Sequence, residues 1–249
     1  MTVVQTPIQI TNQKNHLFWL DFLRGIAIIL VLFHHSTRIP FFDVNFHPVF
    51  NFLYEIGWMG VDLFFVISGC LISGLIFRQI QEENRIHFIR FYLRRSFRIF
   101  PVYISLVAFI FLTSRVHNYP KQLISSSWYF LQNYHYYEIM YFWTSSRLFW
   151  FHTWSLCVEE HFYLLFPFIA VLLQKTKQIF KFPIVVILLF TLSLGFRIYH
   201  FNPMVTDHFP HLFWTHCRMD TISIGCLISY TYIFYPQIAA KPGSRGCRA

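Results

Sequence analysis

The sequence has few charged residues and no closely spaced pair of cysteines. Asp, Glu, Lys and Arg make up 12% of the 249 residues, whereas 55% are hydrophobic. Because soluble domains carry about a quarter of their residues as charges, this balance excludes an ordinary soluble domain. The cysteines form no CxxC pair, so the pattern indicates neither a zinc site nor a disulfide framework. They are Cys70, Cys157, Cys217, Cys226 and Cys247.

Internal repeats, low-complexity tracts and linkers are also missing, which favours one continuous domain. Apolar stretches of about the length that spans a bilayer instead follow one another along the chain. They are Leu17–Ser36, Phe52–Phe77, Ile99–Ser114, Trp154–Leu173, Phe182–His200 and Leu212–Tyr235. The sequence therefore predicts an all-α, polytopic integral membrane bundle of about six transmembrane helices. We expect a cytoplasmic segment at 1–16, the membrane domain at 17–235 and a tail at 236–249.

The net charge of +9 indicates membrane topology rather than nucleic-acid binding, because basic residues collect in cytoplasmic loops. With a cytoplasmic N-terminus, thirteen Lys and Arg residues fall in the inner segments and four in the outer ones. This asymmetry predicts a cytoplasmic N-terminus and a cytoplasmic loop from Arg78 to Arg98. The aromatic and polar segment between Arg115 and Phe151 is expected at the outer face, interfacial or re-entrant.

Ionisable residues occupy the first expected span. Arg24 and His35 lie eleven residues apart, which places them within about 20° on one face of a helix, with Asp21 near the same line. His34 is turned by about 100° from His35. Arg24 and Asp21 can simply pair or reach the interface, but charges inside a span usually face a cavity, and histidine exchanges protons near neutral pH.

Three further groups of ionisable residues in the expected spans are candidates for a functional site. Asp62 lies in a span rich in Gly and Ser, where small residues alone would explain helix packing. Glu159 and Glu160 lie about two turns into the fourth expected span, with apolar sequence on both sides, and Arg218 and Asp220 enter the sixth. We expect these groups in the outer half of the membrane.

Arg94, Arg95 and Arg98 lie three and four residues apart just before the third expected span. This spacing puts them on one helical face, where guanidinium groups can bind phosphate in a bidentate manner. A cytoplasmic anchor would explain the number of arginines but not their spacing.

Four stretches, in this order, resemble the acyltransferase 3 family of polytopic membrane enzymes, which O-acylate sugars of surface polysaccharides, lipopolysaccharide and related acceptors. Arg24 and His35 match the arginine–histidine pair of the family's first span. The stretch GVDLFFVISGCLI matches a second motif, with Cys70 in place of the usual Phe.

The other two matching stretches lie further along the chain. RRSFRIFP, with Arg95, Arg98 and Pro101, matches the arginine motif before the family's third span. WSLCVEEHFYLLFP matches the next signature, with His161 in place of Gln. The resemblance runs from about Trp19 to Tyr230. Family members usually continue through several more spans, so we expect the membrane domain to be incomplete relative to the family.

The resemblance implies transfer of an acyl group, commonly acetyl from acetyl-coenzyme A, to an extracytoplasmic carbohydrate or glycolipid hydroxyl. His35 is then expected as the general base, aided by Arg24 and by Glu159. Arg95 and Arg98, helped by Arg24, are expected to bind the phosphates of acyl-coenzyme A, and no metal is expected. The residues expected to contact the acceptor are Asp62, Trp154, Arg218 and Asp220. The resemblance also implies an integral protein of a bacterial inner membrane.

Other interpretations remain open from the sequence. A covalent acyl-histidine intermediate would use the same residues. A transporter or flippase for a sugar-lipid would also need charges inside the membrane, but would not depend on coenzyme A. An inactive acyltransferase fragment would keep all four motifs.

Overall fold

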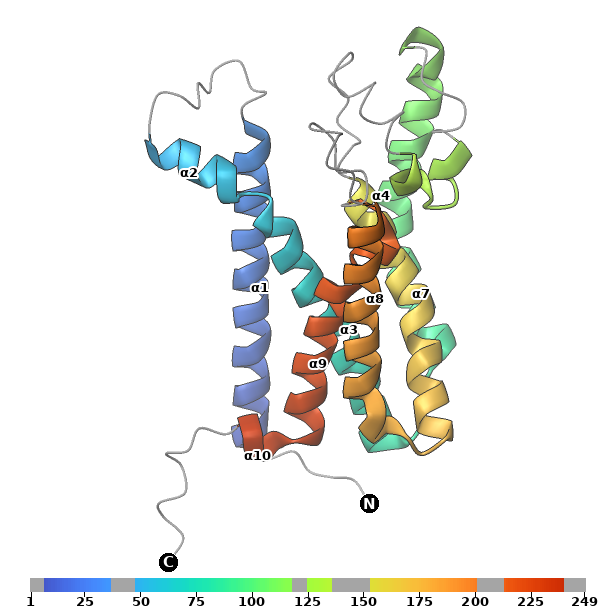
Figure 1. The fold of residues 1–249 in the computed structure, drawn as a ribbon. Helices are drawn as coiled ribbons and strands as arrows, with labels where there is room; N and C mark the ends of the chain where they lie inside the picture. The colour runs from blue at the N-terminus through green and yellow to red at the C-terminus, as the bar shows by residue number, and fades with distance from the viewer. Residues whose placement is uncertain (1–6, 37–47, 118–124, 136–152, 201–212, 240–249) are drawn as a thin grey trace, which may run out of the picture. The chain divides into compact units, whose positions relative to one another are not determined.

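In the computed structural model, the described residues are 7–36, 48–117, 125–135, 153–200 and 213–239. Within these ranges the regular elements are helices and no strand occurs. The long helices are α1 (Pro7–Ser36), α3 (Met59–Glu83), α4 (Phe88–His117), α7 (Thr153–Lys175), α8 (Phe182–His200) and α9 (Met219–Phe234) (Figure 1). The short elements are α2 (Pro48–Ile56), α10 (Pro236–Ala239) and the 3-10 turns η2 (Gln132–Tyr134), η4 (Ile179–Lys181) and η6 (Thr215–Cys217).

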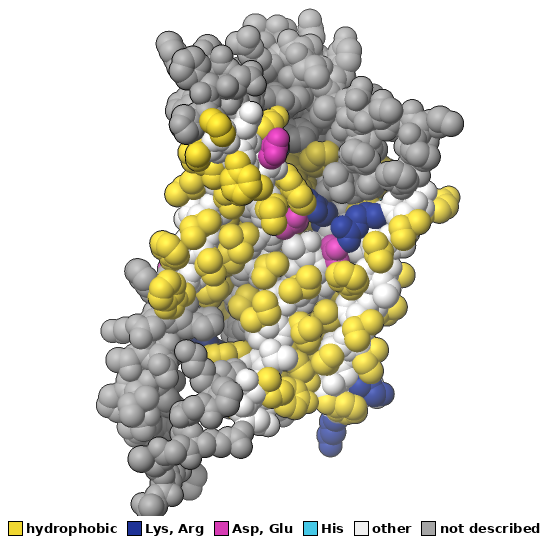
Figure 2. Space-filling view, turned by 60° about the vertical axis from the view of Figure 1, so that its left-hand side comes forward, with side chains coloured by type: hydrophobic (Ala, Val, Ile, Leu, Met, Phe, Trp, Pro, Cys, Tyr) yellow, Lys and Arg dark blue, Asp and Glu magenta, His cyan; other side chains and the backbone are white. Residues whose placement is uncertain are grey.

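Four of these helices are long and apolar enough to cross a membrane. They comprise residues 59–83, 88–113, 153–175 and 179–200, and α9 is a shorter apolar helix. Large hydrophobic side chains remain exposed along them, as the space-filling view of Figure 2 shows for one face. Since a soluble protein rarely exposes so much contiguous apolar surface, the chain is an integral membrane protein and the predicted all-α membrane fold is confirmed.

Four expected spans begin at other residues in the structure. The first helix begins at Pro7 rather than Leu17, and α9 begins at Met219 rather than Leu212. The second span begins at Met59 rather than Phe52, because the preceding residues form the separate helix α2. The third helix begins at Phe88 rather than Ile99, so Arg94, Arg95 and Arg98 lie on α4 and not in a loop. The expected cytoplasmic loop from Arg78 to Arg98 was therefore too long. Apolar residues between the arginines extend the helix toward the turn after α3.

The chain divides into two compact units, residues 1–69 and residues 70–249, and α3 runs from the first into the second. In the N-terminal unit, α1 contacts α2 and the start of α3. A Cβ atom on Gly57 would lie 2.5 Å from the carbonyl oxygen of Leu30, and one on Gly60 would lie 2.5 Å from that of Ala27. These two glycines allow backbone contact between helices, as small residues do in membrane proteins.

In the C-terminal unit, α4 packs along α7 and α8 packs along α9. The Tyr92 hydroxyl donates a hydrogen bond of 3.1 Å to the Leu164 carbonyl, which fixes the register of α4 against α7. The turn from α3 to α4 contains Asn84 with φ of 49°, a left-handed conformation that Asn tolerates well. Gln174, near the end of α7, donates a hydrogen bond to the Asn84 side chain.

Aromatic rings form the core at one end of this unit. Phe77 lies at the centre, with ring centroids of its neighbours 4.9 to 5.7 Å away. The neighbours are Phe166, Phe182, Tyr230 and Phe234. The cluster joins α3, α7, α8 and α9, and edge-to-face contacts between such rings stabilise the packing beyond simple burial. The cluster holds these four helices in a fixed arrangement, and the helices in turn position the polar side chains described below.

Candidate functional site

The polar residues of α1 have different local partners. Arg24 Nη1 lies 3.3 Å from Asp21 Oδ1, one helical turn away, so the simpler pairing that the sequence allowed is present. Arg24 and His35 are separated by about 16 Å along the helix axis. They share a helix but do not form one local site.

The two histidines at the end of α1 make different contacts. The His34 ring lies against the Tyr54 ring and its Nδ1 donates a hydrogen bond of 2.8 Å to the Tyr54 carbonyl. His35 Nδ1 donates one of 2.7 Å to the carbonyl of Val31 on the same helix. Because a carbonyl can only accept, Nδ1 of neutral His35 carries the proton and Nε2 carries the lone pair. The same reasoning puts the proton of neutral His34 on Nδ1, so the two histidines share one tautomer. They differ in their partners, because His34 packs against Tyr54 of α2 whereas the Nδ1 hydrogen bond of His35 stays within its own helix.

Asp62 lies in the first turn of α3 and is half-buried. A carboxylate is favoured there by the partial positive charge of a helix N-terminus, so this placement alone assigns it no chemistry.

In the C-terminal unit, Arg95 of α4 meets the two glutamates of α7. Arg95 Nη2 lies 4.0 Å from Glu159 Oε2, and its Nε lies 3.8 Å from Glu160 Oε1. The guanidinium group also lies over the ring of Tyr163, whose hydroxyl donates a hydrogen bond of 2.8 Å to Glu159. One cation, two carboxylates and an aromatic ring thus form a compact polar centre between two membrane-spanning helices. The sequence predicted Arg95 and Glu159 as functional residues but placed them on opposite sides of the membrane.

The neighbouring arginines of α4 are placed differently. Arg94 and Arg98 are exposed, and Arg98 makes no hydrogen bond or ion pair with the described residues. The three arginines are not equivalent: Arg95 is held by carboxylates, whereas Arg98 has its donors open to a ligand.

Three of the four residues predicted to contact an acceptor are buried at the start of α7 or of α9. They are Trp154, Arg218 and Asp220. Asp220 pairs with Arg197 of α8, a partner that the sequence did not suggest. Arg218 lies with its guanidinium carbon 5.6 Å from the ring centroid of Trp154. The Trp154 ring also packs against Phe213. The structure therefore brings Trp154 and Arg218 together, and gives Asp220 a separate ion pair.

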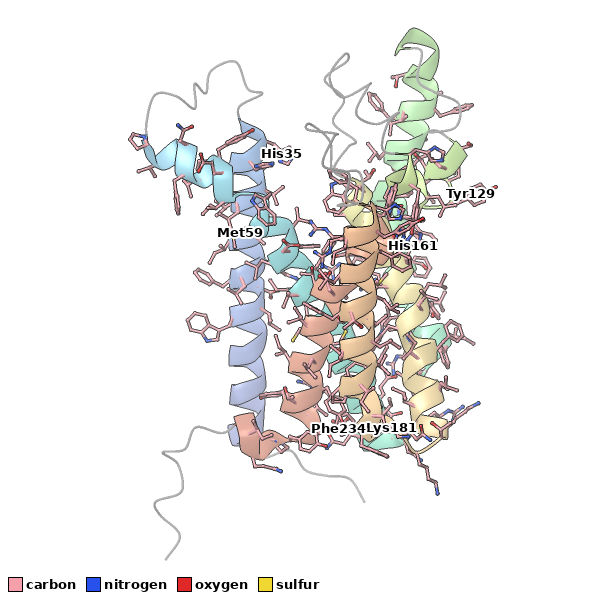
Figure 3. All side chains as sticks on the ribbon, in the orientation of Figure 1. His35, Met59, Tyr129, His161, Lys181 and Phe234 are labelled. Carbon is pink, nitrogen blue, oxygen red and sulfur yellow. The ribbon has the colours of Figure 1, made fainter. Side chains whose placement is uncertain are left out.

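A second polar network, which the sequence did not predict, lies among the turns at the same end of the C-terminal unit. Asn133 donates a hydrogen bond of 2.9 Å to Thr215, and His161 Nδ1 lies 2.7 Å from the same hydroxyl oxygen. The Tyr134 hydroxyl lies 3.4 Å from His216 Nδ1, and the two rings are stacked. Figure 3 shows His161 toward one end of the unit and Lys181 and Phe234 at the other.

Two residues of this network lie in turns outside the spans, and burial shifts both pKa values. Burial raises the pKa of the Tyr134 hydroxyl above its usual 10.0, so it stays protonated. Burial, and then the nearby His200, lower the pKa of His216 below its usual 6.5. Both side chains are therefore neutral hydrogen-bonding groups at pH 7. Burial also raises the pKa of the Cys217 thiol to about 11, so this cysteine is not a reactive thiolate.

Among the described residues, no group of three or more His, Cys, Asp and Glu side chains is arranged to hold a metal ion.

The family model and the similar proteins found by comparison both point to acyltransferases. The family model of acyltransferase 3, described as an acyltransferase domain, matches residues 17–237. O-acetyltransferase OatA of Staphylococcus aureus (strain NCTC 8325 / PS 47) is 30% identical over 239 residues, which cover 89% of this chain and 35% of that protein. OatA of S. aureus strain COL gives the same identity and coverage. The chain thus spans about a third of the length of these curated relatives, and no solved structure matches it.

Proposed function

Because the chain belongs to the acyltransferase 3 family, whose model covers residues 17–237, we propose that it transfers an acyl group from acyl-coenzyme A to a carbohydrate hydroxyl. The observation that carries this proposal is the match over nearly the whole membrane domain to relatives named O-acetyltransferases. Their name favours acetyl as the acyl group and acetyl-coenzyme A as the donor. The acceptor is a surface polysaccharide, a lipopolysaccharide or a glycolipid.

In this proposal His35 is the general base. The acceptor oxygen attacks the thioester carbonyl carbon, His35 Nε2 takes the hydroxyl proton, and the carbon–sulfur bond breaks. The proton then passes to the leaving thiolate, which balances the reaction. The hydrogen bond from Nδ1 to the Val31 carbonyl supports this role, because it holds the ring in the tautomer that accepts a proton at Nε2. Such a base typically contributes about 10² to 10⁴ in rate.

The arginines of α4 are proposed to bind the donor phosphates. Arg98 is the stronger candidate, since it is exposed and has no partner among the described residues. To bind a phosphate, Arg95 would have to leave its ion pairs with Glu159 and Glu160. In the proposal, breaking and re-forming these ion pairs accompanies binding and release of the donor. Arg24, paired with Asp21, is proposed as an auxiliary donor contact.

The proposed location is a bacterial inner membrane with the N-terminus in the cytoplasm. The excess of Lys and Arg in the inner segments supports this orientation. Asp62, Trp154, Arg218 and Asp220 remain proposed acceptor contacts.

The test of the proposed function is mass analysis of surface glycans from cells with and without this protein. Replacing a hydroxyl hydrogen with an acetyl group adds 42 Da. This added mass should be found on the glycans of cells with the protein and should be absent from cells without it. Identical glycan masses in the two cell lines, with the protein present in the membrane, would contradict the proposal.

A further inference from the structure

A cavity of about 420 Å³ lies within the C-terminal unit, between α7, α8 and the start of α9. Its volume falls in the range of small-molecule sites. Along α7 its lining runs from His161 to Ile169, eight residues or about 12 Å. That is close to the hydrocarbon depth of a single bilayer leaflet, about 15 Å.

The cavity has one polar end. Tyr134, His161, Thr215 and His216 all contribute to its lining, and they belong to the hydrogen-bonded network described above. The ring nitrogen Nε2 of each of these two histidines makes no hydrogen bond with the described residues. Each histidine therefore retains one donor or acceptor for a bound molecule.

The rest of the cavity is mostly apolar, with Ser223 of α9 as a further polar residue in its lining. Phe166 and Phe182, with ring centroids 6.1 Å apart, line it and belong to the aromatic cluster around Phe77. In Figure 3 that cluster's end of the unit, marked by Lys181 and Phe234, is opposite the end marked by His161. The walls include Leu164 and Leu165, which are more than half exposed on the surface of α7. The cavity is thus bordered by side chains that face the lipid hydrocarbon.

Charge narrows the class of ligand. The described residues that line the cavity include no Lys, Arg, Asp or Glu. The lowered pKa of His216 keeps its ring neutral at pH 7, and the raised pKa of Tyr134 keeps its hydroxyl protonated. A phosphate would find no compensating cation here, and burying an uncompensated charge is costly. An uncharged head group with hydroxyls fits the neutral donors and acceptors.

The dimensions of the cavity suit a single extended hydrocarbon chain as the occupant, because the lining along α7 is about 12 Å long and borders on leucines exposed on the surface of that helix.

We propose that this cavity binds one hydrocarbon chain of an amphipathic lipid whose uncharged, hydroxyl-bearing head group hydrogen-bonds with Tyr134, His161 and His216. The identification of this lipid as the acceptor, a glycolipid rather than a free polysaccharide, rests on the proposed function. Binding of the lipid does not.

The experiment is photolabelling of the protein in lipid nanodiscs with a dodecyl glucoside that carries a diazirine at the end of its chain. Peptides that contain residues 162–169 and 182–189 should be labelled, and excess unlabelled dodecyl glucoside should compete. Leu189→Trp fills the cavity and should weaken competition by about tenfold or more. Leu188→Trp is the matched control, because Leu188 is the exposed neighbour that does not line the cavity, and it should leave labelling unchanged.

A dodecyl phosphate probe with the same diazirine tests the head group and should label these peptides much less. Equal labelling by the phosphate probe would overturn the uncharged head group. The proposed site would be overturned if the label spread over all helices and did not respond to Leu189→Trp. It would also be overturned if the cavity-lining peptides stayed unlabelled, as expected when another part of a protein fills the cavity. Since labelling requires no turnover, its failure leaves the proposed acyl transfer standing, and loss of acyl transfer leaves the lipid site standing.

Discussion

Arg95 of α4 and Glu160 of α7 face each other inside the membrane domain with Nε and Oε1 3.8 Å apart. Both atoms are buried, and neither has a hydrogen-bond partner among the described residues. At this distance the opposite charges attract each other, but the two atoms are too far apart for a hydrogen bond. The two side chains therefore form an ion pair whose geometry no hydrogen bond between these atoms fixes. Such an arrangement suits a cation that exchanges carboxylates for the phosphates of a donor.

Removal of the shared cation should destabilise the protein. Arg95→Met leaves Glu159 and Glu160 without a counter-charge, and breaking a buried pair in this way costs about 3–5 kcal/mol. We expect a lower melting temperature in detergent, and partial recovery when both glutamates are also changed to Gln. Arg98→Met is the control and should leave stability within about 0.5 kcal/mol, since Arg98 is exposed. An unchanged melting temperature for Arg95→Met would show that the pair contributes nothing.

The contacts of His34 predict a structural effect without loss of chemistry. His34→Ala removes the stacking on Tyr54 and the hydrogen bond to its carbonyl, so the α1–α2 contact should weaken by about 1–3 kcal/mol. The melting temperature in detergent should fall, while acyl transfer per folded molecule stays within a few-fold. A complete loss of transfer by a well-folded His34→Ala protein would assign His34 to the reaction.

Gly60 is predicted to be intolerant of any side chain. Gly60→Ala places Cβ 2.5 Å from the Ala27 carbonyl oxygen, and relief of this clash should cost about 1–3 kcal/mol. Gly25→Ala on α1 is the control, since a Cβ there meets nothing within 4 Å. Thermal unfolding in detergent compares the two. Equal stability of both variants would mean that α1 does not contact the start of α3 this closely.

The histidine in η6 predicts a pH dependence of stability. Because burial and His200 hold the pKa of His216 below 6.5, the folded state binds its proton less readily than the unfolded state does. The stability contributed by neutral His216 is complete above pH 6.5 and is lost as the pH falls through its lower folded pKa. Melting temperatures between pH 8 and pH 5 should therefore fall less for His216→Gln than for the unaltered protein. Parallel curves for the two proteins would contradict this.

The sequence was sufficient for features that repeat along one helix. The apolar runs predicted the membrane helices, and a helical period placed His34 and His35 on different faces of α1, where they have different partners. These features depend on neighbours a few residues apart, which periodicity describes directly.

Contacts between helices were not predictable in this way. Arg95 and Glu160 are separated by sixty-five positions, and the charge pattern alone assigned Arg95 to a cytoplasmic loop. The pairing of Arg197 with Asp220 depends on how α8 packs against α9. The polar end of the cavity is assembled from a helix and two turns, and no local pattern indicates that Tyr134, His161 and His216 converge.

Acetyl-coenzyme A labelled in the acetyl group tests whether the protein transfers an acyl group with His35 as general base. Membrane vesicles containing the protein and its acceptor glycans should incorporate the label into base-labile esters. His35→Ala, at an equal membrane level, should lower the rate by about 10² to 10⁴. His34→Ala should retain most of the rate. Transfer by the His35→Ala protein at the rate of the unaltered protein would contradict the role of His35, and absence of label with the unaltered protein would contradict acyl transfer itself.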